Sequence, residues 1–291
     1  MNGLLLSLSL CAGVCKNIIS KIGSGVMSGI KKILSVNVFT GAVALIVFAC
    51  FGLDFSFAKN SVALFIVLAV LYGFFTVAAQ TSCIAAVHYG DVSLCTMIYS
   101  SGFIIPTIFS AVYFNEELGA LKIVGIALML VSILIMNLNF ERERSRSPLY
   151  LVFAFSAMIC SGVIGILQKL FAHKLGSGGI DEYLFVSFAC VLLFSLPFML
   201  MLRKSDFESS QKTKLFLLFA IIIAICTVFN NKLNLYLSAN MDGTVFFPIY
   251  NGGVVVFSSL LSKFIIKEKM SWQKYVGIIG GVASIILISL A

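Results

Sequence analysis

Ten apolar stretches, each close to the length of a membrane span, constrain this chain more than any other feature. A helix needs about 20 apolar residues to cross the hydrocarbon core, and only helices or closed barrels satisfy their backbone there. The composition agrees, since 60% of the 291 residues are hydrophobic and 11% are charged. We therefore predict an all-α integral membrane protein with ten transmembrane helices, at 3–22, 36–53, 61–86, 92–114, 119–138, 149–171, 182–202, 213–237, 244–266 and 272–290.

Two long stretches of the chain repeat the same order of residues. Each begins with an Asp, continues through an Ile-Tyr pair into an apolar span, and turns at a Glu. Glu116 precedes Gly125 by the same nine residues that separate Glu268 from Gly277. A second apolar span follows each Gly, so each copy is predicted to be a hairpin of two membrane helices.

The repeat extends over the whole chain. The four residues from Cys11 to Val14 align with the four from Cys160 to Val163. The chain therefore divides into a first copy at 1–140, a basic linker at 141–148, and a second copy at 149–291, with five spans in each copy. Because five is odd, the second copy must enter the bilayer in the opposite direction, which gives inverted repeats.

This duplicated hairpin, with a Glu in its turn and a Gly after it, resembles the end of the EamA-type repeat of the drug/metabolite transporter superfamily. The resemblance covers the whole chain in span count and repeat length. It implies a ten-helix transporter built from two inverted five-helix repeats. It also implies a cavity lined by the first, third, fourth, sixth, eighth and ninth spans.

The span at 213–237 carries a polar stripe. Polar side chains avoid lipid and face either protein or a water-filled path. Its stripe lies on one helical face, because its members are spaced i, i+3, i+4 and i+7: Thr227, Asn230, Asn231 and Asn234. Lys232 lies beside them. The corresponding span of the first copy, 61–86, carries a similar stripe with Tyr72, Thr76, Gln80 and Cys83.

Further polar residues lie in the first, fourth, sixth and ninth spans. Because the stripes fall at corresponding positions of the two copies, we predict one substrate-binding site shared between them. Its candidate residues are Asn17, Thr76, Gln80, Tyr99, Ser100, Gln168, Thr227, Asn230, Asn231, Asn234, Tyr250 and Asn251. The alternative for each is that it only forms a hydrogen bond to a neighbouring helix.

Prolines and lysines within the spans lead to separate expectations. Pro248 is expected to kink or unwind the ninth span, and Pro106 the fourth, because proline lacks a backbone donor. Lys16, Lys169 and Lys232 lie close enough to span ends to extend their ammonium groups to the interface, and this is what we expect of them.

Residues at the two turns and in the last span have structural interpretations. Glu116 and Glu268 are expected to cap or orient their hairpins rather than to bind substrate. Gly277 and Gly281 form a GxxxG pattern, which is expected to serve helix packing.

Loop charge predicts the orientation. Of the 20 Lys and Arg residues, 15 lie on the side with the connections after the first, fifth, seventh and ninth spans, and 5 lie on the other side. By the positive-inside rule the first side is cytoplasmic and both termini are outside. Many members of the superfamily that the chain resembles have both termini inside. We follow the charges, because no basic residue precedes Lys16.

The absence of a mid-span carboxylate bears on the substrate. The small multidrug resistance transporters of the same superfamily carry a Glu in the first helix, where this chain has Gly13 and, in its second copy, Gly162. We therefore expect a neutral, zwitterionic or anionic metabolite, such as an amino acid or a related compound, to be moved by secondary alternating-access transport. A passive channel or facilitator on the same scaffold and a multidrug efflux carrier are the alternatives.

Other classes of function find little support. The chain has no HExxH motif, no GxSxG motif and no nucleotide-binding loop, so we expect neither an enzyme nor direct use of ATP. We expect no cofactor, and no metal site at His88 or His173. The formal charge of +8 is explained by loops rather than by nucleic acid.

The expected partners are therefore a small-molecule substrate and the lipid bilayer, with a coupling ion or exchange as the driving force. We expect a monomer or a homodimer in the inner or plasma membrane of a bacterial cell.

Overall fold

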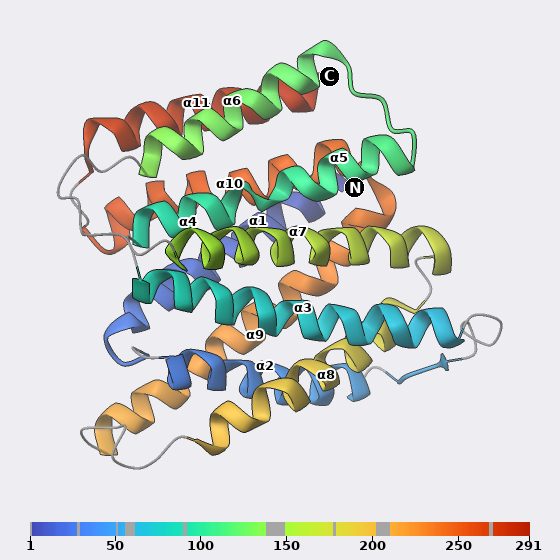
Figure 1. The fold of residues 1–291 in the computed structure, drawn as a ribbon, viewed down its shortest axis with the longest axis vertical. Helices are drawn as coiled ribbons and strands as arrows, with labels where there is room; N and C mark the ends of the chain where they lie inside the picture. Colours follow the sequence, from blue (N-terminus) through green and yellow to red (C-terminus); the bar gives the residue numbers. More distant parts are fainter. Residues whose placement is uncertain are drawn as a thin grey trace. The chain divides into compact units, whose positions relative to one another are not determined.

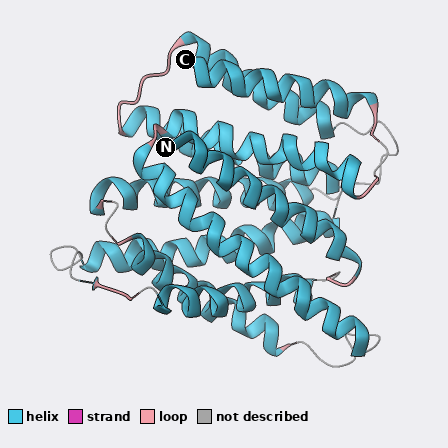
Figure 2. Cartoon of the chain, turned by 180° about the vertical axis from the view of Figure 1, so that it is seen from behind, coloured by secondary structure: helices cyan, strands magenta, loops and turns pink. Residues whose placement is uncertain are grey.

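The computed structural model shows a helical chain (Figure 1). It describes residues 2–27, 30–50, 52–55, 62–89, 92–137, 149–176, 179–201, 210–267 and 270–291. All regular elements in these ranges are helices (Figure 2). They are α1 (Asn2–Ile22), η1 (Gly23–Gly25), α2 (Ile30–Cys50), α3 (Val62–Tyr89), α4 (Val92–Ser100), η3 (Ser101–Phe103), α5 (Ile104–Tyr113), α6 (Ala120–Asn137), α7 (Leu149–Leu175), α8 (Ile180–Leu200), α9 (Ser210–Asn240), α10 (Gly243–Ile265) and α11 (Trp272–Leu290).

The ten predicted spans are confirmed, because the described residues contain 10 helical stretches long and apolar enough to cross a bilayer. The differences lie at helix ends. The second helix begins at Ile30 rather than at 36, and α9 covers Ser210–Asn240 rather than 213–237. Hydropathy marks only the part of a helix inside the hydrocarbon core, whereas the helix itself continues into the interface.

The two intramembrane prolines have different outcomes. The fourth span is interrupted by the 3₁₀ turn η3, just before Pro106, so its helix departs from α geometry there as expected. The expectation that the ninth span unwinds is wrong, since α10 is continuous with Pro248 inside it. Pro248 lies near the start of α10, so the carbonyl that loses its donor belongs to Thr244 in the first turn, where the helix interior is not broken.

The chain forms two compact units. Unit 1 consists of Gly3–Val77 and Leu170–Ala239, and unit 2 of Ala78–Lys169 and Asn240–Ala291. Each unit therefore takes helices from both predicted copies of the sequence repeat. The predicted basic linker at 141–148 lies outside the described residues.

Aromatic residues fill the interior of unit 1. Phe171 stacks on Tyr183 with ring centroids 4.0 Å apart, and Phe65 and Tyr72 of α3 contact Tyr183 edge-on. The Tyr183 hydroxyl donates a hydrogen bond to the Leu68 carbonyl. A buried tyrosine thus packs its ring and satisfies its hydroxyl on the same helix, α3. Elsewhere in this unit, α2 packs along α8.

Helices α6 and α11 of unit 2 lie side by side along their lengths (Figure 1). A Cβ atom on Gly277 would overlap Met136 and lie 2.7 Å from the carbonyl oxygen of Ser132. The hydroxyl of Ser284 donates to the Gly125 carbonyl at 2.6 Å. Lipid offers helices little hydrophobic reason to associate, so small residues that allow close packing stabilise the pair. The packing role predicted for Gly277 is confirmed.

We expect Gly277→Val to reduce the free energy of unfolding by about 1–3 kcal/mol, because the added side chain has no space against α6. Gly3→Val is the control, since nothing lies within 4 Å of a Cβ atom there. Thermal unfolding in detergent, followed by circular dichroism, measures both variants. Equal midpoint temperatures for the two variants would contradict the packing assignment.

Candidate functional site

The predicted polar face of α9 lies within unit 1 and is turned toward α1 and α3. Asn230 and Asn234 are buried, and the Ser9 hydroxyl of α1 lies within hydrogen-bonding distance of both side-chain carbonyls, at 3.3 Å from that of Asn230. A serine hydroxyl has one proton, so it donates to only one of these oxygens at a time. The two amides are therefore coupled through one hydroxyl group.

Asn231 joins α9 to α3. Its side-chain oxygen accepts a hydrogen bond from the Tyr72 hydroxyl at 2.6 Å, and its amide nitrogen donates to the Thr227 carbonyl at 2.8 Å. The Thr227 hydroxyl donates in turn to the Ile223 carbonyl one turn earlier. The polar face thus makes hydrogen bonds within α9 and to two neighbouring helices.

A lysine lies close to this polar face. Lys16 of α1 is partly buried and lies near Cys226 of α9, the residue before Thr227. On α1, Ser9, Gly13 and Lys16 are spaced as members of one helical face. Ionisable residues inside membrane spans are costly and are characteristic of binding sites and ion pathways.

Two other candidate residues, Thr76 and Asn17, also belong to unit 1. Thr76 of α3 bonds to the carbonyl of Tyr72 in its own helix. The side chain of Asn17 on α1 is exposed.

The remaining candidates belong to unit 2. The Tyr99 hydroxyl of α4 shares a hydrogen bond with Ser161 of α7 and lies near Tyr250 of α10. The Tyr250 ring stacks on Phe246 one turn earlier. Asn251 donates from its side chain to the carbonyl of Phe247.

Three further predicted residues of unit 2 differ in burial. Gln80 and Ser100 are partly buried, and Gln168 of α7 is buried. The twelve candidates thus form a group of six in each unit, and their contact with a substrate stays a prediction.

Sequence reasoning missed Ser9 as a site residue, and it counted Tyr72 and Ser161 among the polar residues of their spans but not among the twelve candidates. A signal for Ser9 was present, because it lies one turn before Gly13 and extends the polar face of α1. Among the residues that the structure describes, no group of three His, Cys, Asp or Glu side chains could hold a metal ion.

A second polar centre lies at the start of α10 in unit 2. The N-cap residue Asp242 makes no side-chain hydrogen bond to this helix. Instead, Glu116 in the turn between α5 and α6 accepts a hydrogen bond from the Thr244 backbone N–H at 2.9 Å. A carboxylate at a helix start satisfies free N–H groups and interacts favourably with the helix dipole. Glu116 therefore caps a helix of the other predicted copy rather than its own hairpin, and Glu268 lies outside the described residues.

Lys169 of α7 completes this centre. Its ammonium nitrogen lies 3.0 Å from a Glu116 carboxylate oxygen and donates to the Met241 carbonyl at 2.7 Å. The side chains of Lys169 and Glu116 are 9% and 10% exposed. The expectation that Lys169 extends to the interface is wrong, because the protein itself supplies a carboxylate and a carbonyl as partners.

The surroundings of Glu116 determine its ionisation. Burial alone would raise the pKa of its carboxyl group, but the backbone N–H groups of Gly243 and Thr244 and the ammonium of Lys169 outweigh burial and hold the pKa below its ordinary value. A lowered pKa in the folded protein means that the carboxylate stabilises the fold above its ordinary pKa. This contribution is lost as the pH falls through the lowered value.

We expect Glu116→Gln and Lys169→Met each to reduce the free energy of unfolding at pH 7 by up to about 3–5 kcal/mol, because each leaves one buried charge without its partner. The double variant should lose clearly less free energy of unfolding than the sum of the losses in the two single variants. Unfolding by SDS in mixed micelles measures all three variants, with Glu117→Gln as the control at an exposed neighbour.

The difference in the free energy of unfolding between the wild type and Glu116→Gln should become smaller as the pH falls through the lowered pKa of Glu116. Additive losses, or a difference that does not depend on pH, would contradict the ion pair.

The chain is similar to known proteins in two ways. Residues 148–290 match the model of a family described as the EamA-like transporter family. A solved structure described as "Crystal structure of protein" is similar over 99% of this chain and 97% of its own, with a TM-score of 0.72 and 13% identity. At this identity the similarity shows a shared fold. No curated protein matches the chain.

Proposed function

This chain belongs to the EamA-like transporter family of the drug/metabolite transporter superfamily, and we propose that it is a secondary carrier that moves a small polar metabolite by alternating access. It is a multi-pass membrane protein, and the bacterial inner membrane is its proposed location. The two predicted inverted copies would rock about a site near the middle of the bilayer. A coupling ion or substrate exchange would drive the movement.

The observation that carries this proposal is the polar face between α1 and α9. Asn230, Asn231 and Asn234 place three amides on one membrane helix, and Lys16 lies near the same helix. An interhelical hydrogen bond in a membrane contributes only about 0.6 kcal/mol on average. Three amides are more than helix association needs, so we assign them to binding of a polar molecule.

The chemistry of this face favours certain substrates. Amides both donate and accept hydrogen bonds, and a lysine ammonium attracts a carboxylate. The chain has no Asp or Glu in the middle of a span to bind a lipophilic cation. We therefore propose a neutral, zwitterionic or anionic metabolite, with an amino acid or a related compound as the first candidate.

Counterflow in proteoliposomes tests the mechanism. A carrier should take up labelled substrate faster into vesicles preloaded with the unlabelled compound, whereas uptake through a passive channel does not depend on the preload. We expect Asn231→Ala to lower this uptake at least about tenfold, although it loses only about 0.6 kcal/mol of stability. Ser289→Ala on the exposed surface of α11 is the control.

Two outcomes would overturn this assignment. One is uptake that ignores the preload, which indicates a facilitator. The other is uptake of quaternary ammonium compounds that Asn231→Ala leaves unchanged, which indicates a multidrug carrier.

Lys16 provides a test of substrate charge. In a thermal-shift screen of amino acids, sugars, nucleosides and organic anions, ligands with a carboxylate should raise the unfolding temperature of the wild type. They should have little effect on Lys16→Gln, because the ammonium that attracts the carboxylate is gone. Lys21→Gln, near the end of α1, serves as the control. If only sugars raised the unfolding temperature, and did so equally in all three proteins, a substrate with a carboxylate would be excluded.

A further inference from the structure

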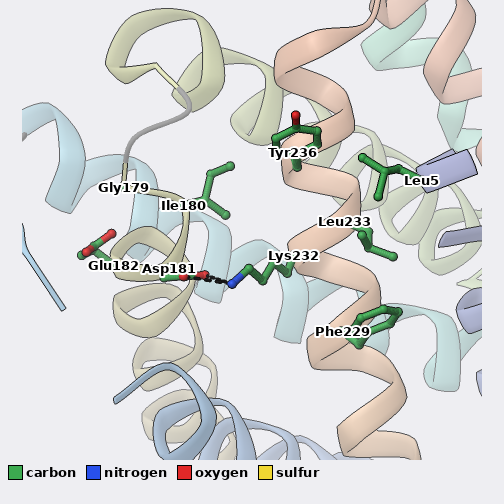
Figure 3. Close-up of a pocket in the computed structure, with 9 residues that line it drawn as sticks. All are labelled: Leu5, Gly179, Ile180, Asp181, Glu182, Phe229, Lys232, Leu233 and Tyr236. Carbon is green, nitrogen blue, oxygen red and sulfur yellow. Dashed lines mark hydrogen bonds and ion pairs between the residues drawn. The ribbon is translucent and has the colours of Figure 1, made fainter. Parts of the chain in front are cut away.

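A pocket of about 550 Å³ lies in unit 1 where α1, the start of α8 and α9 meet (Figure 3). Its wall on α9 consists of Phe229, Lys232, Leu233 and Tyr236, and Leu5 of α1 contributes a further apolar side chain. These α9 residues are spaced i, i+3, i+4 and i+7, so they share one helical face. That face is displaced by two residues, or about 200°, from the amide face at Asn230 and Asn231. The pocket is therefore distinct from the proposed substrate site.

An accessible ion pair lies on the pocket wall (Figure 3). The ammonium nitrogen of Lys232 is 2.9 Å from each carboxylate oxygen of Asp181. The Lys232 and Asp181 side chains are 40% and 26% exposed, whereas the pair at Glu116 is almost completely buried. A charged molecule in the pocket can therefore reach both members of the pair.

The position of Asp181 sets the depth of the pocket in the membrane. Asp181 lies in the first turn of α8, a span of 21 residues. At 1.5 Å per residue such a helix is about 31 Å long, which is close to the thickness of the hydrocarbon core. Its first turn therefore lies at the boundary between the acyl chains and the lipid headgroups.

An apolar surface of α9 leads to this ion pair. Leu218, Ile221, Ile225 and Phe229 are all exposed and follow one another at helical spacing. In a membrane protein, exposed apolar side chains within a span contact acyl chains. The pocket thus joins an acyl-chain surface to one positive and one negative charge at headgroup depth.

We propose that this pocket binds an aminophospholipid of the phosphatidylethanolamine class. The phosphate faces the ammonium of Lys232, the primary ammonium of the headgroup faces the carboxylate of Asp181, and an acyl chain follows the surface that ends at Phe229. A zwitterionic headgroup matches an ion pair, because each of its charges meets the opposite charge in the wall. A primary ammonium donates hydrogen bonds to a carboxylate, whereas the quaternary ammonium of a choline headgroup has no N–H to donate.

Native mass spectrometry of the full chain, released from mixed micelles with equal amounts of phosphatidylethanolamine and phosphatidylcholine of identical acyl chains, tests this proposal. We expect the ethanolamine lipid to be retained in preference to the choline lipid. Asp181→Asn should reduce that preference by about tenfold, because only the headgroup ammonium differs between the two lipids, whereas Lys232→Gln should reduce the retention of both lipids, since both carry the phosphate. Lys263→Gln, which removes a lysine near the end of α10, should leave the preference unchanged.

A second variant separates binding from folding. Leu233→Trp fills the pocket without removing either charge, so it should abolish retention of the ethanolamine lipid. Thermal unfolding in detergent without lipid confirms that each variant is folded, and added ethanolamine lipid should raise the unfolding temperature of the wild type and of Lys263→Gln, but not that of Leu233→Trp.

Three results would overturn the proposal. They are equal retention of the two lipids, a preference that survives Asp181→Asn, and stabilisation by soluble phosphoethanolamine as strong as that by the lipid. The last result would identify a small soluble ligand as the occupant. None of these outcomes depends on transport, so this test and the counterflow test can fail independently.

Discussion

Inside a bilayer, free backbone groups and charges must find their partners within the protein, and the centre at Glu116 meets this constraint for unit 2. One carboxylate accepts from the first turn of α10 and pairs with the ammonium of Lys169. That ammonium also holds the Met241 carbonyl, at the turn that leads into α10. The turn that holds Glu116, helix α7 and the start of α10 are therefore held together at one point. The N-cap residue of α10, Asp242, makes no side-chain hydrogen bond to that helix, so Glu116 takes over its capping role.

The polar groups of α9 meet the same constraint in a different way. Tyr72 donates a hydrogen bond to Asn231, and Ser9 donates one to either Asn230 or Asn234, so these are single bonds between neutral groups. Such bonds are weak in membranes, so a bound molecule can replace them at small cost. Breaking the pair at Glu116 would instead leave an unpaired buried charge. This difference between weak bonds on α9 and a strong pair at Glu116 fits the proposed carrier. Contacts with the substrate form and break in each transport cycle, whereas the start of α10 stays folded.

The sequence was sufficient for the ten spans and for the polar face of α9, because hydropathy and helical spacing act locally. The buried ion pair of Lys169 could not be predicted from the sequence. The position of Lys169 near the end of its span gave no information about its partner Glu116, which lies far away in the sequence. Sequence reasoning also misjudged Pro248, because the effect of a proline depends on which carbonyl loses its donor, and here that carbonyl lies in a first turn. Tertiary partners and helix starts were thus the unpredictable part.

The cap at the start of α10 also concerns the history of the chain. Glu116 belongs to the predicted first copy, whereas Thr244 belongs to the second. A gene divided at the linker would produce two polypeptides, and the second would lack the carboxylate that closes one of its own helices. Were the predicted copies once separate chains, this cap would have been a contact between subunits, and their fusion would have made it permanent within one molecule.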